Sequence, residues 1–331
     1  MSRSVPHREG PVLALSGGIG GAKLVRGLSR VVPAGGLHVL ANTGDDFEHL
    51  GLAICPDIDT LLYTLSGLSD PVRGWGRRDE TWNFMAALAA VGGPTWFRLG
   101  DADLALHVER TRRLGTGESL TAITDAFRRR LGIVSTIWPA SDDPVRTRLH
   151  TRSGWLPFQD YFVARRCEPV VDAIDYEGCI TARACRQALE LLRDQTLRAV
   201  VICPSNPLLS IEPILAIPSL REALRNCAAP VIGVSPIIQG HAIKGPTAKL
   251  LRELDRPVDA LEAARRYQGL LDGYILDTCD AALADEPAGG VRIEVAPILM
   301  DSLEGQERLA RECLRCADVL AGESQRRVAV P

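Results

Sequence analysis

Carboxylate side chains are concentrated in one short segment of this sequence. Asp45, Asp46, Glu48, Asp57 and Asp59 fall within fifteen residues that contain no lysine or arginine. Proteins commonly hold Mg²⁺ with one or two carboxylates together with phosphate oxygens. We therefore expect Asp45, Asp57 and Asp59 to contact a magnesium ion, and Asp45 or Asp46 to act as the catalytic proton acceptor. For Asp57 an alternative stays open, because it follows a proline and is well placed to cap a helix.

A glycine-rich loop lies upstream of the acidic segment. Ser16-Gly-Gly-Ile-Gly-Gly-Ala-Lys23 follows a short apolar run and opens a helical pattern. In this context backbone N–H groups and a helix N-terminus bind phosphate. We expect phosphate contacts from Gly17, Gly18, Gly20, Gly21 and Lys23. A tight turn without a ligand is the alternative. The dinucleotide-binding fingerprint requires glycine where Lys23 stands, which argues against an NAD-dependent oxidoreductase.

Two further loops carry groups that suit a phosphorylated ligand. The loop over residues 70–83 carries Arg73, Arg77 and Arg78 together with Trp75 and Trp82. Arginine binds diphosphate oxygens through its bidentate fork, although arginines on a loop are often simply solvated.

Pro204-Ser205-Asn206-Pro207 follows another apolar run. The carboxyl ends of strands line the ligand crevice of an open α/β sheet, so Ser205 and Asn206 are expected to contact the nucleotide.

Short apolar runs that alternate with helical patterns predict a Rossmann-like α/β fold, with a mostly parallel sheet covered by helices on both faces. The expected strands are residues 12–15, 37–41, 133–139, 145–151, 199–203, 230–234, 273–276 and 293–298. Residues 57–132 show helical periodicity without a convincing strand. We therefore expect a core formed by residues 10–56 and 133–321, with a mainly helical insertion of residues 57–132 over the active site. Residues 1–9 and 322–331 are expected to be flexible ends.

Composition excludes several classes of protein. Hydrophobic residues make up 46% and charged residues 24% of the 331, which is ordinary for a globular chain and wrong for a disordered one. The net charge of −3 argues against nucleic-acid binding. No apolar run is long enough to span a bilayer, and the first ten residues lack a signal-peptide core, so we expect a cytoplasmic protein that does not bind membranes.

Several short motifs, taken together, resemble those of the 2-phospho-L-lactate transferases. In chain order they are Asn42-Thr-Gly-Asp-Asp46, Ile54-Cys-Pro-Asp-Ile-Asp-Thr60, Gly74-Trp-Gly76, Glu80-Thr-Trp82, Leu99-Gly-Asp101, Pro139-Ala-Ser-Asp-Asp-Pro144, Phe158-Gln-Asp160, Pro204-Ser-Asn-Pro207, Ser235-Pro-Ile-Ile238 and Lys244-Gly-Pro246. The resemblance extends over nearly the whole chain.

The resemblance implies a Mg²⁺-dependent transferase of coenzyme F-420 biosynthesis. The ribityl hydroxyl of a deazaflavin alcohol would attack the phosphorus of a guanosine-diphosphate-activated phospho-acid, and GMP would leave. The acid could be phospholactate, phosphoenolpyruvate or phosphoglycerate. Asp59 and Arg98 match deazaflavin-contacting positions of the family, and Trp75, Arg77 and Trp82 would complete the substrate site. A homodimer is expected. The rival hypothesis is a non-enzymatic regulator that binds a sugar nucleotide on the same fold.

Overall fold

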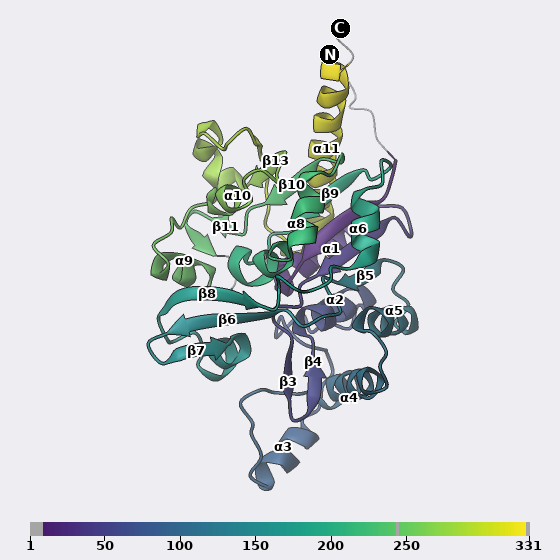
Figure 1. The fold of residues 1–331 in the computed structure, drawn as a ribbon, viewed down its shortest axis with the longest axis vertical. Coiled ribbons are helices and arrows are strands. Elements are labelled where there is room, and N and C mark those ends of the chain that lie inside the picture. Colours follow the sequence, from purple (N-terminus) through teal and green to yellow (C-terminus); the bar gives the residue numbers. More distant parts are fainter. Residues whose placement is uncertain (1–8, 243–244, 329–331) are drawn as a thin grey trace.

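A parallel sheet of seven strands forms the centre of the protein, as the computed structural model of residues 9–242 and 245–328 shows (Figure 1). All neighbouring strands of this sheet pair in parallel. In spatial order they are β14 (Arg292–Val295), β13 (Gly273–Leu276), β10 (Val231–Val234), β9 (Ala199–Ile202), β1 (Val12–Ser16), β2 (Leu37–Ala41) and β5 (Thr136–Pro139). The mostly parallel sheet predicted from the apolar runs is therefore confirmed.

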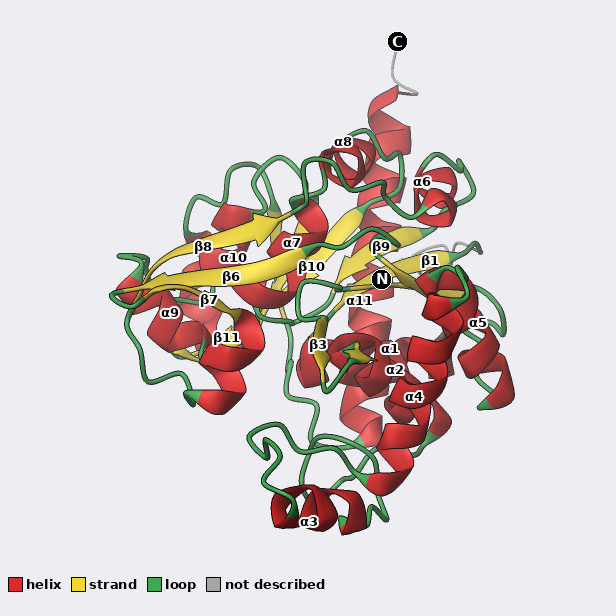
Figure 2. Ribbon diagram, turned by 60° about the horizontal axis from the view of Figure 1, so that its bottom comes forward, coloured by secondary structure: helices red, strands yellow, loops and turns green. Residues whose placement is uncertain are grey.

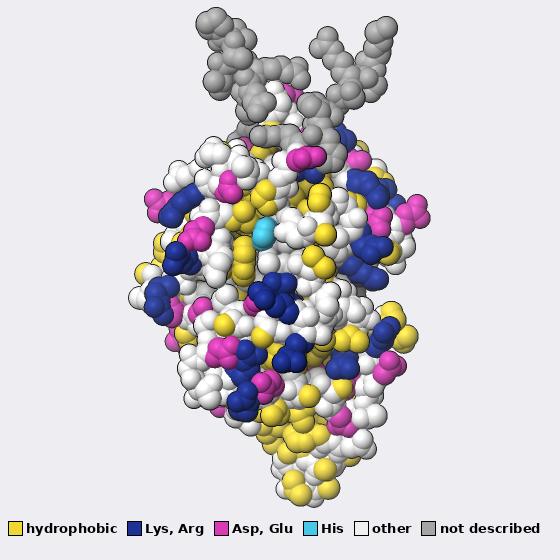
Figure 3. Space-filling model, turned by 90° about the vertical axis from the view of Figure 1, so that its right-hand side faces the viewer, with side chains coloured by type: hydrophobic (Ala, Val, Ile, Leu, Met, Phe, Trp, Pro, Cys, Tyr) yellow, Lys and Arg dark blue, Asp and Glu magenta, His cyan; other side chains and the backbone are white. Residues whose placement is uncertain are grey.

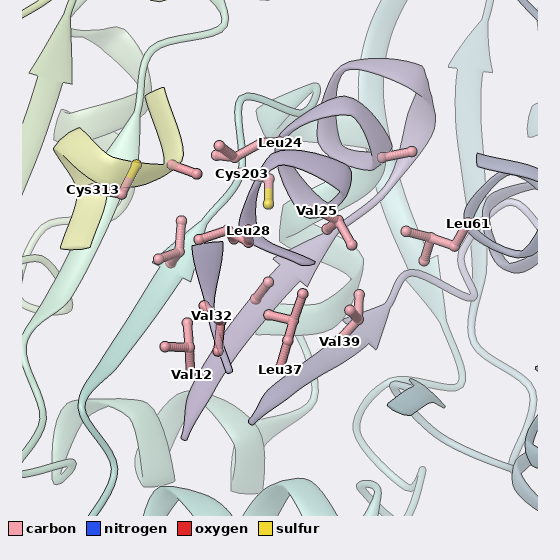
Figure 4. Packing of buried hydrophobic residues seen from close by; sticks show 14 of the residues in the cluster. Val12, Leu24, Val25, Leu28, Val32, Leu37, Val39, Leu61, Cys203 and Cys313 are labelled. Atoms are coloured by element: carbon pink, nitrogen blue, oxygen red, sulfur yellow. The ribbon is translucent and has the colours of Figure 1, made fainter. Parts of the chain in front are cut away.

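Helices cover both faces of the sheet, because alternate residues of each strand point to opposite sides. Val12 and Ala14 of β1 belong to one buried cluster, whereas Leu13 and Leu15 belong to the other. The first cluster includes α1 (Gly18–Val31), α2 (Pro56–Ser66), α5 (Leu120–Arg130) and α11 (Leu303–Val328). The second includes α6 (Arg186–Leu192), α7 (Glu212–Leu215), α8 (Pro218–Arg225) and α10 (Glu262–Arg266). Figure 4 shows the close packing of the first cluster between β1, β2 and α1.

The predicted helical insertion is present. Residues 57–132 form most of α2, then α3 (Asn83–Ala90), α4 (Asp101–Gly115) and α5, and contain no strand. The hairpin of β3 (Phe47–His49) and β4 (Leu52–Ile54) was not predicted, because each strand has only three residues. It packs against the insertion rather than joining the central sheet. Figures 1 and 2 show the hairpin beside α4, with α3 at the far end of the molecule.

A second sheet lies beside the central one and is antiparallel. It consists of β7 (Gly154–Pro157), β6 (Arg146–Thr151) and β8 (Val171–Glu177). The expected strand over residues 145–151 thus exists, but it leaves the parallel sheet. The π-helical turn η1 (Asp160–Ala164) and helix α9 (Thr247–Glu253) pack on this sheet, and the strands β11 (Ile237–Ile238) and β12 (His241–Ala242) form a separate hairpin.

The chain ends differ partly from expectation. Helix α11 continues to Val328, so residues 322–328, which were expected to be flexible, belong to a helix. Helical periodicity weakens there as charged residues accumulate, and the boundary was therefore set too early. Residues 1–8 and 329–331 lie outside the described residues. Within the described ranges, no helix combines the length and apolarity needed to cross a membrane.

Candidate active site

The glycine loop and the Pro204–Pro207 loop meet at the point where the strand order reverses. The chain passes from β1 to β2 on one side, whereas β9, the other neighbour of β1, leads to β10 and β13. Ligands of doubly wound α/β proteins bind in the crevice that such a reversal opens at the carboxyl ends of the strands. A Cβ atom on Gly20 would lie 2.7 Å from the carbonyl oxygen of Pro204, so glycine is required for the two loops to approach.

Ser205 ties the two loops together. Its hydroxyl donates to the Gly17 carbonyl at 2.7 Å and accepts from the Gly17 amide at 3.3 Å. Asn206 caps the next helical turn, η2 (Pro207–Ile211), by accepting from the amides of Leu208 and Leu209. Both side chains were predicted to contact the nucleotide, and in this structure both make hydrogen bonds within the protein at the edge of the crevice.

Side chains of the protein occupy some of the amides at the N-terminus of α1 that could otherwise bind an anion. The first four amides of a helix have no partner within it. Here Ser205 accepts from the Gly17 amide, and the Asp57 carboxylate accepts from the Gly18 amide at 2.6 Å. The amides of Ile19 and Gly20 belong to the same first turn of α1. Lys23 follows on the second turn, where it is half-buried.

Asn42 joins two of the predicted carboxylates. Its Nδ2 donates to Asp45 Oδ1 at 3.0 Å and to Asp57 Oδ2 at 2.9 Å, and it also lies 3.1 Å from the Leu209 carbonyl. The Asn42 Oδ1 atom accepts from the Gly44 amide, which fixes the orientation of the side-chain amide. Asp45 and Asp57 therefore lie side by side, and Asp57 also contacts the glycine loop through the Gly18 amide.

The three carboxyl groups nearest the crevice resist ionisation. Burial raises the pKa of Asp45 well above its usual range, and the neighbouring Asp57 charge raises it further. Burial also raises the pKa of Asp57 to about 6, although hydrogen bonds from Asn42 and the Gly18 amide oppose this. The pKa of Asp46 is raised to about 7 by burial, against the opposing charge of Arg146. One Asp46 oxygen, Oδ1, is buried without a hydrogen-bond partner in the described structure.

Asp59 lies against a buried arginine that the sequence reasoning missed. Arg110 of α4 donates to both Asp59 oxygens, with Nη1 3.1 Å from Oδ2. Arg110 also donates to the Ala53 carbonyl at 3.2 Å, and it is only 1% exposed. His107 lies between Asp59 and Asp103, at 3.6 and 3.2 Å. His107 and Asp103 are four residues apart and thus meet on one face of α4.

The basic loop of residues 70–83 is joined to α4 by reciprocal helix capping. Glu80 accepts from the amides of Ala102 and Asp103 at the start of α4, both at 2.8 Å. Asp101 in turn accepts from the amides of Asn83 and Phe84 at the start of α3, both at 3.0 Å. An aspartate at the start of a helix usually caps that same helix, but here Glu80 caps α4 and Asp101 caps the preceding helix α3.

The predicted aromatic and arginine residues of this region are only partly brought together. The Arg98 guanidinium stacks on the Trp82 ring at 4.1 Å, and Arg73 lies 5.0 Å from the same ring. Trp75 is 46% exposed, and Arg77 pairs through its backbone with Ser69. Arg98 and Trp82 thus form one surface, whereas Trp75 extends towards solvent.

The residues present fit a divalent cation held by two carboxylates. Asp45 and Asp57 share one amide donor, and neither forms an ion pair with an arginine of the described chain. When these two carboxyl groups ionise, no arginine therefore compensates their charge. No set of three or more His, Cys, Asp or Glu side chains in the described ranges could enclose a metal ion. Such a cation would consequently depend on phosphate oxygens or water for its remaining ligands, as Mg²⁺ commonly does.

These features define a Rossmann-like α/β protein with an anion-accepting crevice lined by carboxylates. The family model for the 2-phospho-L-lactate transferase CofD matches residues 12–304. The chain belongs to this transferase family, which carries out a phospho-transfer step of coenzyme F-420 biosynthesis, as the motifs indicated.

Relatives and solved structures agree with this assignment. A phosphoenolpyruvate transferase of Streptomyces griseus is 39% identical over 314 residues, covering 93% of this chain and 98% of that protein. One from Mycolicibacterium smegmatis is 36% identical over 329 residues, covering 93% and 99%. A UPF0052 family protein from Bacillus halodurans, known by crystal structure, has the same fold, with a TM-score of 0.61, 16% identity, and coverage of 93% of this chain and 100% of that chain.

Proposed function

We propose that this chain transfers the phosphoenolpyruvate group from its guanylylated form to the ribityl hydroxyl of a deazaflavin alcohol and releases GMP. The acceptor oxygen forms a bond to the phosphorus that carries the acid, and the bond from that phosphorus to the GMP oxygen breaks. The names of the curated relatives support phosphoenolpyruvate over phospholactate and phosphoglycerate. The observation that carries the proposal is the buried pair Asp45 and Asp57 beside the glycine loop, at the reversal point of the sheet.

Catalysis of this kind depends on positioning and charge neutralisation. Mg²⁺, held by Asp45 and Asp57, would neutralise the diphosphate of the donor. The amides of Ile19 and Gly20, together with Lys23, orient the phosphate oxygens at the start of α1. The arginine loop of residues 73–78 supplies further cationic contacts from the side of the insertion.

Asp46 is the residue we assign as proton acceptor. It directly follows Asp45 and is buried, and its Oδ1 has no partner among the described residues. Its raised pKa, about 7, suits a group that must accept a proton near neutral pH. The proton of the attacking hydroxyl would move to this oxygen as the new P–O bond forms.

Several parts of the sequence-based hypothesis stay predictions. They include the Mg²⁺ requirement, the ligand contacts of the individual site residues, the homodimer and the cytoplasmic location. Asp59 was assigned to both the metal and the deazaflavin; its two oxygens pair with Arg110 here, and neither assignment is needed for the proposed chemistry.

Mass spectrometry of the reaction products tests the proposal. The deazaflavin alcohol is incubated with Mg²⁺ and, in separate reactions, with guanylylated phosphoenolpyruvate, phospholactate or phosphoglycerate. We expect the phosphodiester product and GMP to form fastest with the phosphoenolpyruvate donor, and Asp46→Asn to slow this reaction about 100-fold or more. A faster reaction with another acid overturns the choice of donor. Nucleotide binding without product from any donor overturns the enzymatic function and favours the sugar-nucleotide regulator.

A further inference from the structure

A second cavity lies at the edge of the central sheet opposite to the crevice. Its volume is about 480 Å³, within the range of small-molecule sites. Its walls come from the C-terminal ends of α1 and α2, from residues 132–135 and from the start of α11. Residue 135 directly precedes β5, so the cavity reaches the amino ends of the strands, whereas the glycine loop follows the carboxyl end of β1. We call it the rear pocket; the residues that line it include Arg26, Arg30, Thr64, Val134, Ser135 and Leu303.

Two arginines of α1 give the rear pocket a positive charge. Arg26 and Arg30 are four residues apart, so they share one face of the helix. The Arg26 side chain is half-buried, and its guanidinium has no hydrogen-bond or ion-pair partner among the described residues. Arg30 lies 3.9 Å from Glu307, but Glu307 is only 2.8 Å from Arg311, which is therefore its main partner. No aspartate or glutamate of the described chain lines the pocket, so both guanidinium groups are available to an added anion.

Hydroxyl groups without a partner line the same pocket. Ser135 is only 7% exposed, yet its side chain makes no hydrogen bond to any part of the chain that the structure describes. The Thr64 hydroxyl of α2 likewise has no partner there. Buried polar groups are almost always hydrogen-bonded, and a hydroxyl can donate to an oxygen atom of a ligand. Ser29 and Ser66, by contrast, donate to main-chain carbonyl oxygens of their own helices.

The remaining wall of the rear pocket is apolar. Leu65 and Ile133 contribute to it together with Val134 and Leu303, which are 61% and 36% exposed. Apolar side chains that line a pocket and stay open to water favour a ligand with an apolar part. The larger gathering of hydrophobic side chains lies elsewhere, towards the lower end of the molecule in Figure 3, where Figure 1 places α3. No residue of α3 lines the rear pocket, which thus combines positive charge with a small apolar wall.

We propose that the rear pocket binds a small molecule that joins a phosphate group to an apolar or ring-shaped part. Arginine forks bind phosphate oxygens through two parallel hydrogen bonds, and two neighbouring guanidinium groups match a phosphate dianion better than a singly charged carboxylate. The hydroxyls of Ser135 and Thr64 donate to the same anion, and the apolar wall covers the rest of the ligand. The site shares no residue with the crevice and does not depend on the proposed function.

The two helices that end at the rear pocket begin at the crevice. The Asp57 carboxylate at the start of α2 accepts from the Gly18 amide at the start of α1. Gly18 and Arg26 are eight residues apart, which is about 12 Å along the helix. Between these ends, Val25 of α1 and Leu61 of α2 belong to one buried cluster (Figure 4). The pocket is therefore a site separate from the crevice, joined to it by two packed helices, and any coupling between the two sites must be equal in both directions.

Phenylphosphonate is a suitable probe, because its dianion carries a flat apolar ring and no nucleoside. Isothermal titration calorimetry of the full-length protein gives its Kd, which we expect to be about 1 mM or lower. Arg26→Gln and Arg30→Gln should each raise the Kd about tenfold, as for a charged hydrogen-bonding group removed from a phosphate. Val134→Glu changes an exposed position of the wall and should raise the Kd about tenfold or more by repelling the anion, whereas Val134→Gln, of equal size, should stay within about threefold.

Arg186→Gln is the matched control. Arg186 is also a helical arginine near a glutamate, Glu190, but it is 87% exposed and lies on α6, which covers the other face of the sheet. Its loss should leave the Kd within about twofold, as expected for a surface position outside the site. Urea unfolding of each variant checks that the fold is retained. A native protein that does not bind phenylphosphonate, or equal binding by Arg26→Gln, Arg30→Gln and Val134→Glu, overturns the inference.

GMP distinguishes the rear pocket from the crevice. If GMP and phenylphosphonate compete for the crevice, the apparent Kd of the probe rises in proportion to the GMP concentration, and the inference fails. If the sites are separate, any change in that Kd levels off once GMP is saturating. The fate of the proposed function is read independently: a protein that binds the probe in the rear pocket but forms no product from any donor refutes the function and supports the pocket.

Discussion

Removing the buried arginine of α4 should destabilise the whole protein. Arg110 and Asp59 are 1% and 5% exposed and meet through the two terminal guanidinium nitrogens and both carboxylate oxygens. Burial alone would lower the pKa of Arg110, but the Asp59 charge raises it overall, as expected for a pair in which each charge depends on the other. Arg110→Met leaves the Asp59 carboxylate buried without its cation.

The expected loss follows from this geometry. Breaking a buried ion pair by removing one partner costs about 3–5 kcal/mol, because the other charge stays uncompensated. Asp59→Leu should cost a similar amount for the same reason. The double variant Asp59→Leu/Arg110→Met replaces both charges with apolar groups and should be more stable than either single variant, since no buried charge is left alone.

Urea unfolding of the four proteins in this cycle gives the coupling energy between Asp59 and Arg110. Arg183→Gln is the matched control. Arg183 also binds a carboxylate, Asp143, through two nitrogens, but its side chain is 87% exposed. Loss of that exposed pair should cost less than about 1 kcal/mol.

The result also decides the role of Asp59. If Asp59 holds α4 against α2, stability falls in both single variants and recovers in the double variant. Single variants that unfold like the native protein, with only the reaction slowed, would show that Asp59 acts on a ligand and that the pair with Arg110 is dispensable.

Three further predictions concern the crevice and the insertion. Excess EDTA should abolish turnover, and Mg²⁺ should restore it, because Asp45 and Asp57 lack an arginine partner; full turnover in EDTA would contradict the metal site. The metal-free protein should lose stability as the pH rises from about 4 through about 7, because the raised pKa values of Asp45, Asp46 (about 7) and Asp57 (about 6) make the native state bind protons that the unfolded state has released; Asp46→Asn should reduce the slope of this dependence in urea unfolding, and an unchanged slope would show that Asp46 does not contribute to it. Glu80→Ala should cost about 1 kcal/mol and increase protease cleavage in residues 70–83, because it removes the cap of α4; cleavage of the native loop should in turn fall when GMP and Mg²⁺ are bound, if the loop closes over them. Equal cleavage in all samples would show that Glu80 does not hold the loop and that the loop does not close over the ligands.

Much of the architecture could be predicted from the sequence, because the patterns that define strands and turns are local. Apolar runs such as Leu37–Ala41 and the glycine-rich start of α1 define strands and a strand-to-helix turn within a few residues. The β3–β4 hairpin was not predicted, because its strands of three residues are too short to show an alternation of apolar and polar residues. The strand β6 was located correctly, but its sheet was not, since a strand's own pattern does not identify its partners.

For the site, sequence alone determined which groups are available: the glycines, the carboxylates of residues 45–59 and the motifs that define the family. Only the tertiary structure decided which of them act together. Asp59 is separated from Arg110 by 51 residues and Gly17 from Ser205 by 188, and neither contact has a local signal. Asn42 could be found from its motif, but its bridge between two carboxylates could not. The physical reason is that hydrogen bonds and buried charges act over a few ångströms in space, and only the folded chain determines which distant residues come that close.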